Sequence, residues 1–198
     1  MKVCTCLNPL HTCLAIFGCV LGYNKISDEM KDEELVKLVE TVGYKEGLPV
    51  VVNPGILDPK EFIDTVLKVR VPNPFMPDTP QRIATDTSQK IVVRFGETMK
   101  SYMASSELDC SSLVYIPLAI AGWLRYLLGT DDKLEKMELS SDPMLANLQE
   151  KLSGVEAGKP ETYTGQLKEI LTNKAIFGVD MYEAGLADKV EGMFVEML

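Results

Sequence analysis

The stretch LVYIPLAIAGWL, residues 113–124, decides the fold class of this chain of 198 residues. It is twelve residues long, almost wholly apolar, and followed at once by Arg125. A helix that crosses a membrane needs roughly 20 such residues, so this stretch is too short to span a bilayer. Its large apolar side chains recur at the spacing of one helical face, at Leu113, Ile116, Ile120 and Leu124. The stretch therefore predicts a helix buried within a folded protein.

Elsewhere the chain repeats one helix-start signal, a capping residue followed by proline. Proline is favoured at the first helical position, and an Asp, Asn or Thr before it accepts hydrogen bonds from free backbone N–H groups. The pairs are Asn8-Pro9, Asp58-Pro59, Thr79-Pro80 and Asp142-Pro143. After Asp58 the apolar periodicity runs to about Arg70.

Other segments also carry helical periodicity. Residues 28–42 and 180–197 are amphipathic, and Ile91, Val92, Phe95 and Met99 form an apolar stripe. Residues 48–52 are a β-like run, which the prolines around it confine to one short extended piece. We therefore predict a single all-α domain over residues 1–198, with about eight to ten helices and at most one short extended segment.

The charge of the chain argues against nucleic acid as a partner. Its net charge is −9 and its sequence pI is near 4.7. Nucleic-acid binding requires clustered Lys and Arg to neutralise phosphates, and no such cluster occurs in the sequence. An anionic small molecule is not excluded, because one nearby arginine outweighs a distant net charge.

The five cysteines predict neither a zinc site nor a disulfide framework. They are Cys4, Cys6, Cys13, Cys19 and Cys110, with no C-x-x-C pair among them. An odd number of cysteines in a chain of this length is typical of reduced thiols in a cytoplasmic protein that holds no metal.

The N-terminal stretch leaves an alternative open. Residues 16–19, IFGC, loosely resemble a lipoprotein cleavage box, which would make the chain an exported helical protein. Against this interpretation, Asn8, Pro9 and His11 interrupt the apolar region, and Lys2 is the only positive charge before it. Cytoplasmic localisation is therefore the expectation.

Three residues near the start of the chain form a candidate reaction centre. His11, the only histidine, lies three residues after Asn8, and Lys2 precedes both. Around the start of a helix, backbone N–H groups and the helix dipole favour a developing oxyanion. A lysine in this positive field has a lowered pKa and exchanges protons near neutral pH. Such a trio suits the interconversion of an alcohol and a ketone. The alternative is that Asn8 is only a helix cap and Lys2 a solvated chain end.

Three segments together resemble the long-chain mannitol dehydrogenase family. Residues 2–23, KVCTCLNPLHTCLAIFGCVLGY, resemble its catalytic helix, whose pattern is K-x-x-x-x-N-x-x-H. Residues 69–95, VRVPNPFMPDTPQRIATDTSQKIVVRF, are similar to its R-x-x-N-P, Asp, R-[IVL]-A and Ser-x-Lys segment. Residues 118–129, LAIAGWLRYLLG, resemble a helix of its C-terminal core.

The resemblance implies which residues carry the chemistry. It makes Lys2 the general acid/base, with Asn8 and His11 hydrogen-bonded to the reacting oxygen. Lys2 precedes Asn8 by six residues where the family pattern has five, so the assignments of Asn8 and His11 are firmer. The matched segment also makes Arg70, Arg82 and Lys90 candidates for substrate binding, and Arg94 is a further cation of this segment.

The resemblance also implies an architecture and a reaction. The fold would be the multi-helical C-terminal substrate domain of proteins like 6-phosphogluconate dehydrogenase. The NAD(P) would be held by an N-terminal Rossmann-type domain, and this chain contains neither G-x-G-x-x-G nor a P-loop motif. We expect a fructuronate reductase-like interconversion of D-mannonate and D-fructuronate, with the chain inactive on its own. Partners would be a sugar acid or polyol, and either a second copy or a separate Rossmann-domain chain.

Two alternatives to this function stay open. One is the corresponding domain of a mannitol 2-dehydrogenase, which interconverts mannitol and fructose. The other is a non-catalytic module that binds sugar or serves assembly.

Overall fold

The computed structural model describes residues 7–52, 55 and 58–198, and these residues form helices, two isolated β-bridges and no strand. The longer helices are α1 (Asn8–Val20), α3 (Glu33–Glu40), α4 (Pro59–Thr65), α7 (Glu97–Ala104), α8 (Tyr115–Tyr126), α9 (Leu145–Lys151) and α12 (Ala187–Glu196). The short helices are α2 (Ile26–Glu29), α5 (Pro80–Ile83), α6 (Thr87–Ile91), α10 (Lys168–Leu171) and α11 (Lys174–Phe177), with 3₁₀ turns at Leu48–Val50, Cys110–Ser112 and Pro160–Thr162. The prediction of an all-α fold is confirmed.

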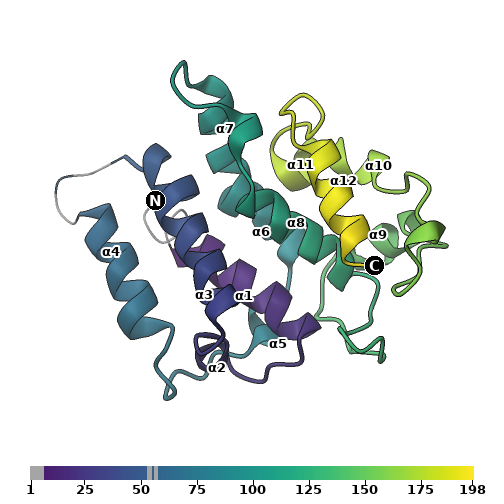
Figure 1. The fold of residues 1–198 in the computed structure, drawn as a ribbon, viewed down its shortest axis with the longest axis horizontal. Helices are drawn as coiled ribbons and strands as arrows, with labels where there is room; N and C mark the ends of the chain where they lie inside the picture. The colour runs from purple at the N-terminus through teal and green to yellow at the C-terminus, as the bar shows by residue number, and fades with distance from the viewer. Residues whose placement is uncertain (1–6, 53–54, 56–57) are drawn as a thin grey trace.

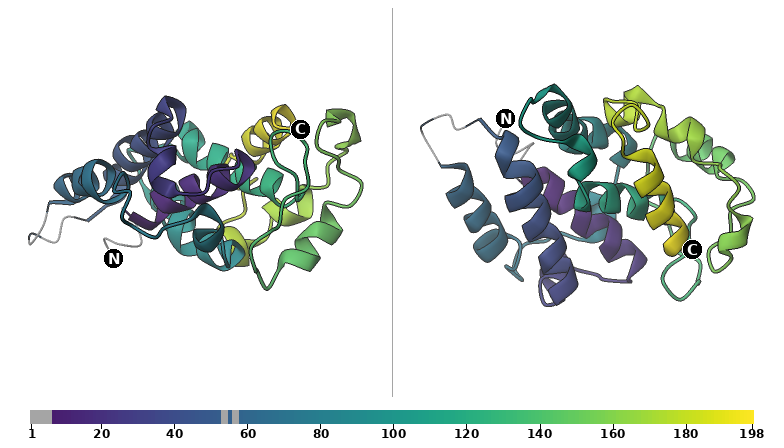
Figure 2. Two further views of the ribbon diagram at one scale, coloured as in Figure 1. Left: turned by 90° about the horizontal axis from the view of Figure 1, so that it is seen from below. Right: turned by 45° about the horizontal axis from the view of Figure 1, so that its top comes forward.

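Helix α8 is the centre of the arrangement. It packs against both α1 and α12, and α1 packs in turn against α5. The N-terminal helices gather at one end of the molecule and α9–α12 at the other, with α8 between them (Figures 1 and 2). The predicted stripe is buried, since Leu113, Ile116, Ile120 and Leu124 are each at most 1% exposed. None of the helices formed by the described residues has the length and apolarity to cross a membrane.

The close approach of α1 and α8 depends on a glycine. A Cβ atom added to Gly122 of α8 would lie 2.6 Å from the ring of Phe17 on α1. Atoms at that distance overlap, so only glycine lets the ring lie against the α8 backbone.

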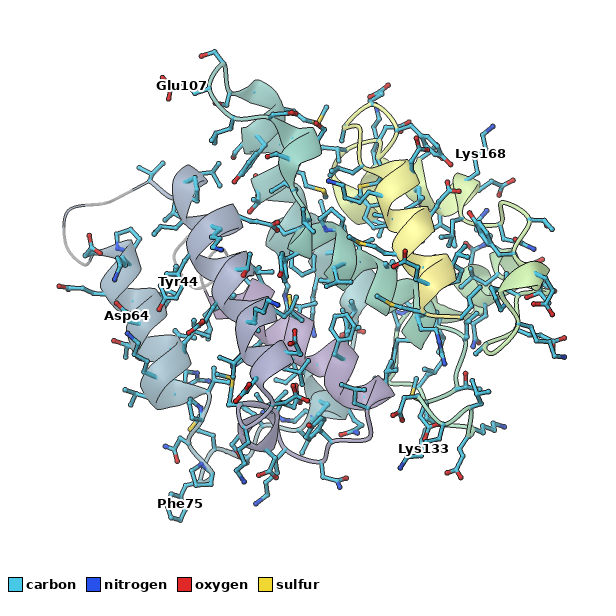
Figure 3. The ribbon with its side chains drawn as sticks, viewed as in Figure 1. Tyr44, Asp64, Phe75, Glu107, Lys133 and Lys168 are labelled. Atoms are coloured by element: carbon cyan, nitrogen blue, oxygen red, sulfur yellow. The ribbon has the colours of Figure 1, made fainter. Side chains whose placement is uncertain are left out.

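Several helices continue into wider, π-helical turns. These turns are Thr41–Gly47 after α3, Val66–Arg70 after α4, and Val92–Gly96, which joins α6 to α7. The helix predicted from Asp58 to Arg70 is therefore present, and the Asp58 carboxylate accepts hydrogen bonds from the first N–H groups of α4 as expected. The Tyr44 hydroxyl donates to Asp64 over 2.7 Å and ties the first of these turns to α4 (Figure 3).

The structure differs from the prediction in several places. Leu48–Val50 is a 3₁₀ turn rather than an extended piece, because it continues directly from Thr41–Gly47 and the fixed φ of Pro49 suits a helical turn. The segment 28–42 is broken, and the Asp32 carboxylate caps the new start at α3. The last helix begins at Ala187, because a turn occupies the residues before it.

Two of the four proline pairs do not act as predicted. Asn8 lies inside α1, after Leu7, and no side chain caps this helix. The Asp142 carboxylate accepts from Ser88, 54 residues away, and α9 begins only at Leu145. The Asp142 carboxylate also accepts from the N–H of Met144, so it serves the local turn and the distant Ser88 together.

Candidate functional site

His11 lies on α1 and is 6% exposed, and its Nε2 atom is buried without a hydrogen-bond partner. Burial lowers the pKa of His11 to about 4, against an ordinary value of 6.5. The imidazole is therefore neutral at neutral pH. A buried polar atom with no partner is costly in a folded protein, and such atoms mark places where a ligand or water completes the contact.

The charges around His11 are mainly positive. Arg70, Arg94 and Arg82 each lower the pKa of His11 further, while the Asp78 carboxylate raises it. This local balance contrasts with the net charge of −9 for the whole chain.

Asp78 holds two of these arginines together. Its carboxylate accepts a hydrogen bond from Arg82, and Arg70 Nη2 lies 3.8 Å from the same carboxylate. The Asp78 side chain is 11% exposed, whereas those of Arg70 and Arg82 are 43% and 59% exposed. The arginines thus reach from solvent onto a buried anion.

The local sequence explains the position of Arg82. The Thr79 hydroxyl accepts a hydrogen bond from the backbone N–H of Arg82, and Pro80 occupies the first turn of α5. This cap fixes the first turn of α5, from which the Arg82 guanidinium reaches back to Asp78, just before the helix. Asp78 is thus the partner of Arg82.

Arg94 reaches α1 from the π-helical turn Val92–Gly96. Its guanidinium donates to the hydroxyl of Thr12, which donates over 2.8 Å to the backbone oxygen of Asn8. Thr12 is 1% exposed and next to His11 in the sequence, yet the motif did not identify it as part of the site. Only the distant Arg94 reveals its involvement.

Lys90 lies on α6 and its ammonium donates to the backbone oxygen of Thr85. Partial burial lowers the pKa of Lys90, the charge of Arg94 lowers it further, and Asp86 and Asp142 act in the opposite direction. Lys90 is thus linked to the His11 region through Arg94.

The predicted N-terminal trio is described only in part. Asn8 is the first residue of α1 and lies three residues, about one helical turn, before His11. Lys2, Cys4 and Cys6 lie outside the described residues. The functional assignments of Lys2, Asn8, His11, Arg70, Arg82 and Lys90 remain predictions.

The segment between Arg70 and Asp78 exposes an aromatic side chain. Phe75 is 92% exposed and projects from the edge of the molecule (Figure 3). Sequence reasoning did not select it, because its exposure depends on the fold. Among the described residues, no group of three or more His, Cys, Asp or Glu side chains is placed to hold a metal ion.

Comparisons with known proteins match the whole chain to one family. Residues 1–197 match the model of the mannitol dehydrogenase C-terminal domain. The chain is 58% identical over 198 residues to D-mannonate oxidoreductase of Thermotoga maritima, covering 100% of this chain and 36% of that protein. It is 28% identical to D-mannonate oxidoreductase of Escherichia coli, over 88% of this chain and 34% of that protein. The chain therefore spans about a third of the length of these relatives.

Solved structures share the fold. Mannitol 2-dehydrogenase of Pseudomonas fluorescens, in a ternary complex with NAD and D-mannitol, superimposes with a TM-score of 0.82 at 20% identity, covering 98% of this chain and 37% of that one. A substrate-free D-sorbitol dehydrogenase gives a TM-score of 0.76 at 25% identity, over 100% of this chain and 40% of that one.

Proposed function

We propose that this chain, which belongs to the mannitol dehydrogenase C-terminal domain family, is the substrate-binding and proton-transfer half of an NAD(P)-dependent sugar-acid oxidoreductase. The reaction would be the fructuronate reductase-like interconversion of D-mannonate and D-fructuronate. The relatives named D-mannonate oxidoreductase support this choice of substrate.

The observation that carries the proposal is the unpartnered Nε2 atom of His11 in a positive setting. A neutral imidazole hydrogen-bonds an alcohol or carbonyl oxygen without adding charge. Arginines bind a carboxylate through charge-assisted, often bidentate hydrogen bonds. Arg70 and Arg82 are more than a third exposed and supply such donors near His11. The surroundings of His11 thus offer a partner for each end of a hydroxy acid.

The proton roles follow from the pKa values. With its pKa lowered to about 4, His11 is not protonated at pH 7 and does not serve as the acid there. His11 and Asn8 would orient the reacting oxygen at the start of α1, where the helix dipole favours a partial negative charge. Lys2 would give up or take the proton of that oxygen.

The described residues do not fit a dinucleotide. Pyrophosphate binding of the Rossmann type needs a strand, a glycine-rich turn and a helix, and these residues form no strand. The nicotinamide would instead be held by a separate Rossmann-type domain.

Substrate binding is tested on the 198-residue chain by NMR. Because His11 is the only histidine, the signals of its imidazole are unambiguous. Adding D-mannonate should shift these signals in a saturable manner, and Arg82→Ala should weaken binding about tenfold, the loss of one charge-assisted contact. D-Mannitol at equal concentration should shift them less. Tighter binding of mannitol would favour the mannitol 2-dehydrogenase alternative, and no shift with either ligand would overturn the proposal.

Catalysis is tested by adding a separately expressed Rossmann-type domain of a relative. The mixture should oxidise D-mannonate with NAD(P), whereas the chain alone should not. A non-catalytic binding module would bind the sugar acid and stay inactive in the mixture.

A further inference from the structure

The two candidate substrate cations Arg82 and Lys90 lie on separate helices, α5 and α6, of only four and five residues. A helix as short as α5 is not stable by itself and must be held by other contacts. Helix α6 continues through Val92–Gly96 into α7, so the join between α5 and α6 is the part that needs fixing. Between them Asp86 has a φ of 54°, in the left-handed region that non-glycine residues rarely adopt. The spacing of the two cations therefore depends on what fixes this junction.

One short segment, residues 140–142, bonds to every part of the junction. The Ser140 hydroxyl donates over 2.6 Å to the backbone oxygen of Gln81 in α5. The backbone oxygen of Ser141 accepts over 2.8 Å from the N–H of Asp86. We call residues 140–142 the strap.

Asp142 makes the strongest contact of the strap. Its carboxylate accepts from the backbone N–H of Ser88 over 2.8 Å and from the Ser88 hydroxyl over 2.5 Å. Ser88 is fully buried, and a carboxylate at the first turn of α6 satisfies a backbone donor there. The same carboxylate accepts over 2.9 Å from the N–H of Met144, which fixes its orientation.

The strap is anchored in turn to the core. The hydroxyl of Tyr126, on α8, accepts over 2.7 Å from the backbone N–H of Ser140. Tyr126 is 3% exposed. A chain of contacts thus runs from the central helix through the strap to both short helices that carry the cations.

We propose that the strap is a positioning element for the substrate site, and that Asp142 is its principal positioning residue. By holding α5, Asp86 and α6 at fixed points, it sets the distance between Arg82 and Lys90 and thereby the affinity for a sugar acid. This inference rests on the proposed function. It also explains why Ser88 accompanies Lys90 in the Ser-x-Lys motif: the serine docks its helix on the strap.

The test compares Asp142→Ala and Asp142→Asn with a matched control, Asp109→Ala. Asp109 also accepts from the N–H and hydroxyl of a serine, Ser111, but in an exposed local turn that carries none of the candidate site residues. The Kd for D-mannonate is measured from the His11 NMR signals and the Tm from circular dichroism. Asp142→Ala should raise the Kd about tenfold, and Asp142→Asn, which keeps one acceptor oxygen, less. Asp109→Ala should leave the Kd within about twofold.

The outcomes separate the two proposals. If D-mannonate does not shift His11 in the unsubstituted chain, the proposed function fails. If D-mannonate binds the unsubstituted chain, and a folded Asp142→Ala variant binds it with the same Kd and only a lowered Tm, the strap is merely structural and the inference is overturned. Should Asp142→Ala not fold, Asp142→Asn and Ser88→Ala take its place, and an unchanged Kd in both overturns the inference.

Discussion

The carboxyl group of Glu29 lies directly against the α-carbon of Gly18, in space that any side chain at residue 18 would fill. Glu29 is fully buried and neither of its carboxyl oxygens has a hydrogen-bond partner. Burial raises the pKa of Glu29 to about 9, and the charge of Asp32 adds to the effect. The group is therefore protonated at neutral pH and packs from the end of α2 against Gly18 of α1.

Glu29→Gln should remove a loss of stability at high pH. Unfolded, Glu29 ionises near 4.5, whereas in the fold it stays protonated to about 9, so its contribution is full below pH 4.5 and is lost as pH rises toward 9. The neutral glutamine has no such dependence. The free energy of unfolding, measured with urea, is compared between the variant and the parent at pH 4.5 and at pH 8. The difference in favour of the variant should be about 2–4 kcal/mol larger at pH 8.

Glu34→Gln is the control for this experiment, because the Glu34 side chain is 83% exposed. It should change the stability about equally at both pH values. Parallel pH profiles of Glu29→Gln and the parent would show that Glu29 is ionised in the folded protein.

The imidazole of His11 should titrate far below the usual histidine range. Its folded pKa is lowered to about 4, so the signals should show a midpoint near that value. Because the unfolded state binds the proton from pH 6.5 downward, the stability contributed by neutral His11 is full above that pH and is lost as pH falls toward 4. Asp78→Asn should move the midpoint lower, since Asp78 raises this pKa. A midpoint near 6.5 would place the imidazole in solvent.

The contact between Gly122 and Phe17 predicts opposite effects for two glycine substitutions. Gly122→Ala should destabilise the chain by about 1–3 kcal/mol, because the added methyl overlaps the Phe17 ring. Gly192→Ala, on α12, should stabilise it by about 0.5–1 kcal/mol, since a Cβ there meets nothing within 4 Å and alanine favours a helix. Thermal unfolding measures both, and equal effects of the two substitutions would contradict the close packing of α1 on α8.

Local signals predicted the fold better than the site. The starts at Asp58 and Thr79 were predictable because the cap and the capped N–H groups are neighbours in sequence. The helix after Asp142 starts only at Leu145, later than predicted, and the second contact of its carboxylate, with Ser88 54 residues away, could not be read from the sequence. The burial of Glu29 was equally hidden, since it depends on a glycine of a different helix.

For the site, the sequence motif supplied the residues but not their partners. It named His11, Arg70 and Arg82, and the fold brings them into one electrostatic environment. The role of Asp78 as the anion shared by both arginines required the structure, because Arg70 belongs to the turn after α4 and Arg82 to α5.

The π-helical turn Val92–Gly96 has a consequence for helical phase. The buried residues Ile91, Phe95 and Met99 are spaced four apart. On a regular α-helix, a step of four residues rotates a side chain about 40° around the helix axis relative to the previous one. A π-helical turn has more residues per revolution, so each residue rotates less around the axis and the three side chains stay on one face. The same turn carries Arg94, whose guanidinium donates to the Thr12 hydroxyl on α1. Deleting one residue from this turn should restore ordinary helical spacing and shift Arg94 relative to α1, so we expect a one-codon deletion to break the contact between Arg94 and Thr12.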